Sequence, residues 1–149
     1  MSNTQALCTS FKIDQLNAIH AFGTTVVRAG TSADSFKFAL YQTSANIGAA
    51  TSAYSATNEV SSAGYSAGGA AVTAFTAPTS SGTTAYCTPG GALTWTGVTF
   101  TTDAGLLYNA TQSNKAVGVF TFGSQTVTVG NFSLNMPAND STHALLQIN

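Results

Sequence analysis

The side chains that could do acid–base chemistry are few and widely spaced in this chain. The five carboxylates are Asp14, Asp34, Glu59, Asp103 and Asp140, and no two of them lie within ten residues of each other. A pair of carboxylates could act as general acid and general base on a glycosidic bond or a similar substrate. Each carboxylate falls instead in an expected turn, loop or helix start, where such residues act as solvated turn and cap residues. The spacing therefore predicts no catalytic pair.

Metal and thiol chemistry have equally little support in the sequence. A protein metal site usually needs three or four ligands, but His20 and His143 stand apart and match no spacing of cysteines or carboxylates. We expect both to be packing or surface histidines. Cys8 and Cys87 have no CxxC spacing, and we expect two buried or semi-buried thiols in preference to a disulfide. No metal and no other cofactor is expected.

The common catalytic motifs are missing from the 149 residues. There is no GxSxG elbow, no HExxH, no Walker loop and no GxGxxG after a strand. The glycine-rich segment Gly64–Gly69 lacks the following helix and lysine that a phosphate cradle needs. Serines are so abundant that a Ser-His-Asp triad could be drawn by chance, and Trp95 is expected to fill a core. The sequence therefore predicts a protein that is not an enzyme.

The overall composition points toward a structural role. Forty residues are Ser or Thr and only nine are charged, whereas charged residues make up about a quarter of most soluble domains. The polar surface must therefore be built from hydroxyls, amides and backbone groups. A surface of short uncharged side chains is suited to packing against other protein surfaces, because such side chains lose little entropy when they are ordered.

Charge and hydropathy also disfavour two classes of partner. Lys12, Arg28, Lys37 and Lys115 are scattered, so no cluster of cations is expected to neutralise the phosphates of a nucleic acid. No apolar run reaches the roughly 18 residues of a membrane span, and Met1–Ser10 lacks the basic-then-apolar pattern of a signal peptide. We expect no nucleic-acid partner, no membrane partner and synthesis in the cytoplasm.

One short helix is expected near the start of the chain, over about Phe11 to Phe22. Apolar residues recur there every three positions, at Ile13, Leu16, Ile19 and Phe22. Thr9 or Ser10 is a suitable N-cap, Asp14 favours the first turn and Gly23 suits the C′ position. We expect the apolar stripe to pack on a β-domain or on a neighbouring subunit.

The rest of the sequence alternates in the manner of strands. Ser35–Thr43 places Phe36, Phe38 and Leu40 on one face, which is typical of a half-buried strand. Further strands are expected at Thr24–Ala29, Ala71–Ala77, Thr83–Cys87, Ala92–Phe100, Gly105–Asn109, Lys115–Phe122, Thr126–Val129, Phe132–Met136 and His143–Ile148.

Eight or nine short strands, drawn from these ten candidate segments and separated by turn signals, predict an all-β fold. We expect an antiparallel β-sandwich, jelly-roll-like, with one short N-terminal α-helix; the order of strand pairing is not readable, so an immunoglobulin-like sandwich stays open. Residues 1–10 would form an N-terminal arm and residues 11–149 a single domain.

The segment Ile47–Gly69 is too long and too small-sided for a simple hairpin loop. It is rich in Ala, Ser and Gly, with Tyr54, Val60 and Tyr65 as its large side chains. Long loops in compact domains are usually functional or disordered. Because these three side chains can anchor it, we expect an ordered excursion on the surface, either an interaction loop or a loosely packed connector.

Three stretches together resemble a known family. Phe38–Thr43 (FALYQT), Thr57–Gly69 (TNEVSSAGYSAGG) and Thr99–Phe122 resemble, in order and spacing, small virion structural proteins of tailed bacteriophages. The resemblance runs from about Phe11 to Ile148. It departs at Phe120–Gly123, where an acidic residue is common before the second Phe and this chain has a neutral Thr, so a charge contact there is not implied.

The resemblance implies a capsid decoration (cement) protein, located on the capsid surface of the virion. Such proteins sit as oligomers, often trimers, on the shell built by the major capsid protein, so the expected partners are that protein and further copies of this chain. The alternatives are a tail or head–tail connector component and a host-glycan-binding fibre or adhesin module.

The N-terminal arm and helix and the Ala53–Gly69 loop are the expected contact elements, with the arm ordered only on the shell. The candidate interface residues are Phe11, Ile13, Leu16, Ile19, Phe22, Tyr54, Asn58, Glu59, Val60 and Tyr65.

Overall fold

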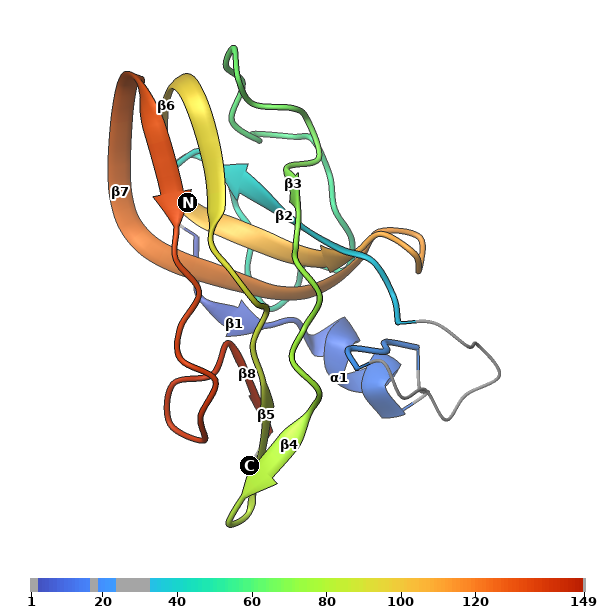
Figure 1. Ribbon diagram of the computed structural model, residues 1–149. Helices are drawn as coiled ribbons and strands as arrows, with labels where there is room; N and C mark the ends of the chain where they lie inside the picture. Colours follow the sequence, from blue (N-terminus) through green and yellow to red (C-terminus); the bar gives the residue numbers. More distant parts are fainter. Residues whose placement is uncertain (1–2, 17–18, 24–32, 149) are drawn as a thin grey trace.

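A computed structural model describes residues 3–16, 19–23 and 33–148, and it is mostly β, with 47% of residues in strands. The elements are β1 (Ala6–Leu7), α1 (Thr9–Leu16), β2 (Phe36–Tyr41), β3 (Ala70–Ala71), β4 (Thr79–Ser81), β5 (Thr84–Cys87), β6 (Leu93–Asn109), β7 (Lys115–Leu134) and β8 (Leu146–Ile148). A five-stranded antiparallel sheet has the order β1-β7-β6-β2-β3, and a three-stranded sheet has the order β4-β5-β8 (Figure 1). The predicted all-β class is confirmed.

The β6–β7 ribbon dominates the larger sheet and corrects the predicted strand divisions. Five expected strands between Ala92 and Met136 merge into two, of 17 and 20 residues. Their register shifts at four places, so the strands bend at bulges where the sequence pattern suggested that they end. Gly97 and Gly123 take φ values of 65° and 74°, a backbone conformation that L side chains rarely adopt. Figure 1 shows the ribbon curling over at the top of the molecule.

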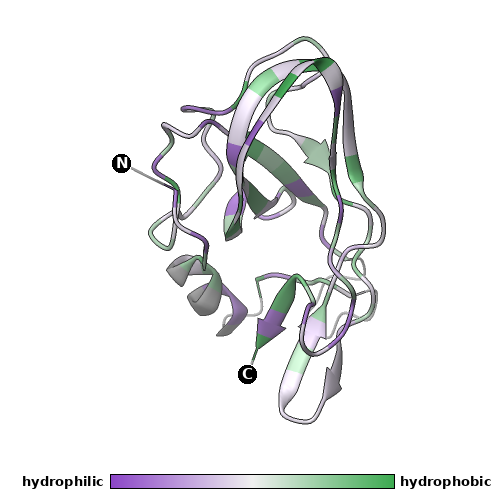
Figure 2. Cartoon of the chain, turned by 90° about the vertical axis from the view of Figure 1, so that its left-hand side faces the viewer, coloured by the Kyte–Doolittle hydropathy of each residue, from purple (hydrophilic) through white to green (hydrophobic). Residues whose placement is uncertain are grey.

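β2 lies inside the larger sheet and is buried on both faces. It pairs with β6 on one side and with β3 on the other, and five of its six residues are buried. The expected half-buried strand is therefore a central one. The Phe38 ring packs directly over Gly105, where a Cβ would lie 1.9 Å from a ring carbon. The core around it includes Leu40, Leu106 and Trp95, so the prediction for Trp95 is confirmed. In Figure 2 most of the chain is near the middle of the hydropathy scale.

The helix α1 is shorter than predicted and begins earlier. It covers Thr9–Leu16, and residues 19–23 are not helical, so Gly23 is not its C′ residue and Asp14 is not in its first turn. The Ile19 N–H donates to the Asp14 carbonyl at 2.9 Å just after the helix. Tertiary packing explains why the helix ends early. The Phe22 ring stacks on Phe36 at 4.7 Å from a non-helical segment, and this contact outweighs the weak preference of the sequence for a longer helix.

The N-terminal segment also differs from the expected free arm. Ala6 and Leu7 pair with β7, and the Thr4 N–H donates to the Ile47 carbonyl at 3.2 Å. The Asn3 amide donates to the Asp103 carboxylate at 2.6 Å. Ala6 and Leu7 are therefore part of the larger sheet, and Asn3 and Thr4 are held by hydrogen bonds within the single chain.

Two expected strands are shorter than the pattern suggested. Only Leu146–Ile148 of the expected His143–Ile148 strand pairs, in the smaller sheet, and only Ala71 of the expected Ala71–Ala77 strand belongs to β3 of the larger sheet. The expected strand Thr24–Ala29 lies outside the described residues. Among the described helices, none is long and apolar enough to cross a membrane.

Candidate functional site

The segment Ile47–Gly69 is ordered, as predicted; together with Asn46 it forms a loop, residues 46–69, that backbone hydrogen bonds hold against the larger sheet. The Tyr54 N–H donates to the Asn114 carbonyl at 2.9 Å, and the Val60 N–H donates to the Leu40 carbonyl at 3.0 Å. Ala53 forms an isolated antiparallel bridge with Lys115. The loop is thus attached to β2 near the end of that strand and to the start of β7.

A buried carboxylate lies at the centre of the loop. Glu59 is 7% exposed, and its Oε1 accepts hydrogen bonds from the Tyr65 hydroxyl at 2.7 Å and the Gly68 N–H at 2.8 Å. Its Oε2 accepts a hydrogen bond from the Tyr54 hydroxyl at 2.7 Å. Three donors compensate for the loss of water around the charge. The prediction that Glu59 is a solvated turn residue is therefore wrong.

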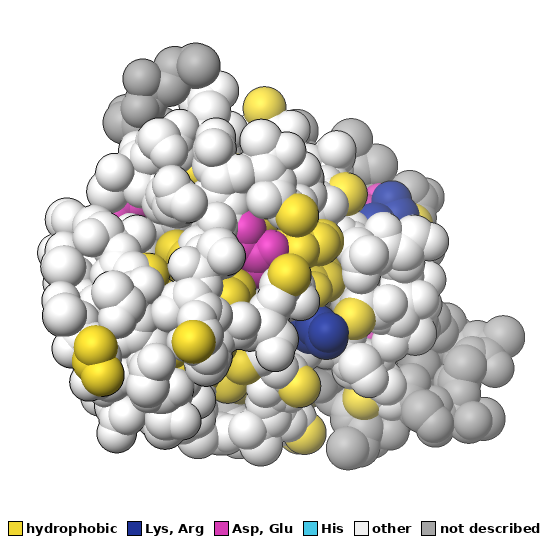
Figure 3. Space-filling model, turned by 90° about the horizontal axis from the view of Figure 1, so that it is seen from above, with side chains coloured by type: hydrophobic (Ala, Val, Ile, Leu, Met, Phe, Trp, Pro, Cys, Tyr) yellow, Lys and Arg dark blue, Asp and Glu magenta, His cyan; other side chains and the backbone are white. Residues whose placement is uncertain are grey.

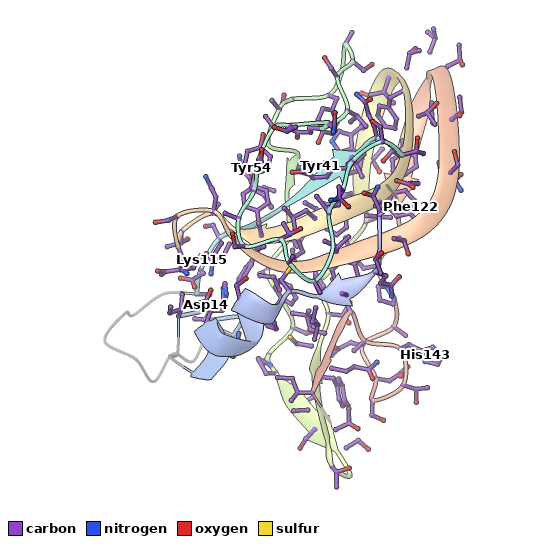
Figure 4. All side chains as sticks on the ribbon, turned by 180° about the vertical axis from the view of Figure 1, so that it is seen from behind. Asp14, Tyr41, Tyr54, Lys115, Phe122 and His143 are labelled. Carbon is purple, nitrogen blue, oxygen red and sulfur yellow. The ribbon has the colours of Figure 1, made fainter. Side chains whose placement is uncertain are left out.

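Four tyrosines surround this carboxylate and fasten the loop. The Tyr108 hydroxyl donates to the Gly68 carbonyl at 2.7 Å, the Tyr41 hydroxyl donates to the Ser55 carbonyl at 2.6 Å, and the Tyr54 and Tyr108 rings stack at 4.9 Å. Tyr65 also accepts the Leu40 N–H at 2.9 Å. Figure 4 shows Tyr54 on the loop and Tyr41 at the β2 end. We call Glu59 with Tyr41, Tyr54, Tyr65 and Tyr108 the tyrosine–glutamate clamp.

The electrostatics of the clamp suit a structural role. Burial, and then the neighbouring Glu59 carboxylate, raise the pKa of Tyr54 and of Tyr65 well above the ordinary tyrosine value. Burial also raises the pKa of Tyr41 and of Tyr108. A neutral phenol remains a hydrogen-bond donor, so the clamp stays closed at physiological pH. No proton transfer near neutral pH is needed for this arrangement.

Around the clamp, the exposed residues from Ser52 to Ala67 are short and uncharged. These residues are Ser52, Ala53, Ser55, Ala56, Thr57, Asn58, Ser61, Ala63, Gly64, Ser66 and Ala67. Asn58 takes a φ of 60°, a left-handed conformation that Asn tolerates better than most residues. The loop therefore presents a fixed surface without long or charged side chains.

The structure separates the predicted interface residues into three groups. Phe11, Glu59, Val60 and Tyr65 are buried in the chain's own core, which removes them as direct contacts for a partner. Asn58 is exposed, and Ile19, Phe22 and Tyr54 are partly exposed. The side chains of Ile13 and Leu16 lie outside the described part of the structure.

A second polar cluster joins α1 to the start of β7 and was not predicted. The Lys115 ammonium lies 3.2 Å from Asp14, and the His20 ring lies 3.6 Å from the same carboxylate (Figure 4). The Asn109 amide donates to Asp34 at 2.7 Å and lies 3.0 Å from His20 Nδ1. Asp14, expected to be a solvated cap, is only 5% exposed. The five residues come from distant segments, so their spacing in the sequence gave no signal.

This second cluster fastens the fold and does not form a metal centre. Within the described ranges, no group of three or more His, Cys, Asp or Glu side chains could hold a metal ion. The carboxylates of Asp14 and Asp34 are instead bonded to the Lys115 ammonium and the Asn109 amide. The cluster therefore ties the N-terminal segment to the β6–β7 turn.

Both cysteines are free, buried thiols, as predicted. Burial raises the pKa of Cys8 to about 11, an effect that one backbone hydrogen bond partly offsets, and it raises the pKa of Cys87 to about 11 as well. The thiolate is the reactive form of cysteine, so neither residue is activated as a nucleophile near neutral pH.

An apolar hollow of about 160 Å³ opens between α1 and the three-stranded sheet. Phe11, Phe22, Leu146 and Ile148 are among the residues that line it. Ligand pockets normally add a few convergent polar groups that orient the ligand, and this lining is overwhelmingly apolar. The hollow therefore offers mainly hydrophobic contact.

Comparisons of the chain with protein-family models, with curated proteins and with solved structures gave no match.

Proposed function

We propose that this chain is a structural protein of a tailed-bacteriophage virion, and specifically a capsid decoration protein. It would bind the outer shell built by the major capsid protein and stabilise that shell. The observation that carries the proposal is the rigid 46–69 loop, on which the tyrosine–glutamate clamp presents only short uncharged side chains. The resemblance of three sequence stretches to phage virion proteins gives the proposal its biological setting.

The loop can form an interface at a low cost in entropy and desolvation. A loop that is already ordered loses little backbone entropy on binding, and Ser, Ala and Gly side chains lose little rotamer freedom. Few charged groups need to be stripped of water. Figure 3 shows only a few charged side chains on the face seen from above. Many symmetry-related copies on a shell can then combine modest contacts into firm attachment.

The proposal includes a jelly-roll-like sandwich as the finer description of the fold. Aromatic rings inside the curl of the β6–β7 ribbon support two facing layers: Phe132 lies 5.5 Å from Phe100 and 5.9 Å from Phe122. Tyr65, from the clamped loop, meets Phe100 at 6.2 Å in the same interior. The curl and the loop together enclose this part of the core.

The remaining parts of the proposal concern partners and location. The partners are the major capsid protein and further copies of the chain in a homo-oligomer, for which a trimer is favoured. The protein is made in the cytoplasm of the bacterial host and resides on the capsid surface. Because Ala6 and Leu7 are already paired with β7 and Thr4 is bonded to the loop, the proposed contact surface is the exposed loop and not a free arm.

Single substitutions on the loop test the proposal without disturbing the clamp. Ala56→Lys places a long charged side chain on the exposed loop, and Thr83→Lys makes a comparable change at an exposed residue of the β4–β5 turn. Binding of each purified variant to shells of the major capsid protein from the same genome is measured by counting bound copies. We expect Ala56→Lys to lose binding and Thr83→Lys to retain it.

Two outcomes would contradict the proposal. One is equal binding by Ala56→Lys and wild type. The other is that particles without the protein survive heat and low ionic strength as well as complete particles do. A small ring of copies per particle would favour a tail or connector component, and glycan binding by the purified chain would favour a fibre module.

A further inference from the structure

The far half of β7 has an open outer edge. β7 pairs with β6 along its whole length, but on its other side β1 pairs only with Val119 and Gly118, and the Gln5 side chain bonds to Thr121. In the part of the chain that the structure describes, no strand pairs with this outer side over residues 123–134. Alternate N–H and C=O groups of such a strand point away from its partner and remain available.

The equivalent edge of β6 is covered, which makes the open edge of β7 distinctive. The Thr99 N–H donates to the Ser62 hydroxyl at 2.8 Å, so the 46–69 loop reaches that edge. Gly64 of the loop lies so close that a Cβ there would be 2.1 Å from the Thr96 carbonyl oxygen. The chain therefore protects one edge of the ribbon and leaves the other exposed.

The residues on the open edge lack most of the usual protection against pairing. The run Gly123–Leu134 contains no charged residue and no proline, the residues that commonly block an edge strand. Only Phe132 in this run is buried. The one protective feature in the run is a bulge at residues 128–129, which interrupts the ladder between Val127 and Gly130.

Val129 sits on that bulge near the middle of the open edge. Its side chain is 82% exposed and its φ is 45°, a left-handed conformation that is strained for a β-branched residue. The Val129 N–H donates to the Thr99 hydroxyl at 2.9 Å, which fixes the bulge. The fold therefore holds a strained apolar side chain out in solvent, where the single chain makes no use of it.

We propose that the open edge of β7 is a two-fold contact with a second copy of this chain. Around a two-fold axis near Val129, the two Val129 side chains pack against each other, and the backbone on either side of each bulge pairs antiparallel with the partner. An isologous contact brings each residue close to residues of the same run, and an uncharged run meets no like-charge repulsion there. The contact does not depend on the capsid proposal.

Substitution of Val129 tests the contact without harming the fold. Val129→Lys removes β-branching at a strained position, so the single chain should stay folded, but it places two like charges beside the two-fold axis. Ile148→Lys is the matched control, because Ile148 is the other large apolar side chain that is well exposed, at 58%, among the described residues. Mass is measured by sedimentation equilibrium, with the fold of each variant checked by circular dichroism.

We expect wild type and Ile148→Lys to contain an even number of 15.1 kDa chains, either two chains or two trimers joined by this contact, and Val129→Lys to have half that mass. Mixing Val129→Lys with Val129→Glu should restore the wild-type mass, because opposite charges then meet at the axis. A monomeric wild type, an odd number of copies, or an unchanged mass for folded Val129→Lys would each overturn the proposal. A normal dimer that does not bind capsid shells would contradict only the proposed function.

Discussion

Removing the carboxylate of Glu59 should destabilise the whole chain by releasing the loop. In Glu59→Ala, the Tyr65 hydroxyl and the Gly68 N–H lose their acceptor in a buried site, and the Tyr54 hydroxyl loses its acceptor in a partly exposed one. A buried donor without a partner costs about 1–3 kcal/mol. The two buried donors, with a smaller cost for Tyr54, give a loss of about 3–5 kcal/mol in the free energy of unfolding.

Glu59→Gln should be much milder, because the amide keeps the shape of the carboxylate. Its oxygen can still accept from Tyr65 and Gly68, and its nitrogen can donate to the Tyr54 hydroxyl after that phenol rotates. What is lost is the strengthening of the hydrogen bonds by charge, which we expect to cost about 1–2 kcal/mol. Thr57→Ala, an exposed change in the same loop, should stay within about 0.5 kcal/mol of wild type.

Urea unfolding followed by fluorescence measures these differences. Trp95 is the only tryptophan, is 4% exposed and lies 6.0 Å from Tyr65, so it reports on the core beside the clamp. For a chain of this size, the loss in Glu59→Ala corresponds to a fall in Tm on the order of 10 °C. The reasoning fails if Glu59→Ala costs less than about 1 kcal/mol, or if Glu59→Gln is as damaging as Glu59→Ala.

Three further predictions concern the backbone, the thiols and the response to acid. In the same urea assay, Gly69→Ala should lower the free energy of unfolding by more than about 3 kcal/mol, because the φ of Gly69 is 73° and a Cβ there would lie 2.0 Å from a backbone oxygen. Gly82→Ala should lower it by only about 1 kcal/mol, because Gly82 has a φ of 59° but open space around it. Cys8 and Cys87 should react with a disulfide reagent at pH 8 only after unfolding, since burial raises the pKa of each to about 11; fast labelling of the folded chain would contradict this. Hydrogen bonds from backbone N–H groups and from a histidine ring lower the pKa of Asp140 below its ordinary 3.8, so the turn at Asp140 should be intact above pH 3.8 and should be lost as the pH falls through the lowered pKa. An NMR titration of Asp140 with a midpoint at or above 3.8 would be inconsistent with those bonds.

The sequence predicted the fold class well because its signal is local. Alternation and turn residues mark strands wherever one face meets the core, and β5 appears almost where the pattern places it. The divisions within β6 and β7 failed for a physical reason. A glycine such as Gly97 or Gly123 is equally compatible with the end of a strand and with a bulge, and only the pairing with the neighbouring strand decides between them.

The boundaries of the helix were wrong because periodicity cannot weigh competing contacts. The stripe that ends at Phe22 is real as a pattern, but Phe22 packs on Phe36 and Phe75 from a non-helical segment. Aromatic packing across the fold outweighed a helix propensity that differs by only a few tenths of a kcal/mol per residue.

The candidate site was found by loop length but misjudged in its parts. The segment's length and its two tyrosines correctly indicated an ordered excursion. The burial of Glu59 was missed because its three donors lie five, six and nine residues away in a loop without periodicity. The available signal was a glutamate placed between two tyrosines in a chain with few charges, because a buried carboxylate needs hydrogen-bond donors and phenols can supply them.

Electron microscopy of phage particles from the genome that encodes this chain tests its proposed role most directly. We expect many copies of the chain on the outer surface of the capsid shell, at symmetry-related positions, with the 46–69 loop against the major capsid protein. Density for the chain confined to a ring at the neck, to the tail or to fibres would contradict it.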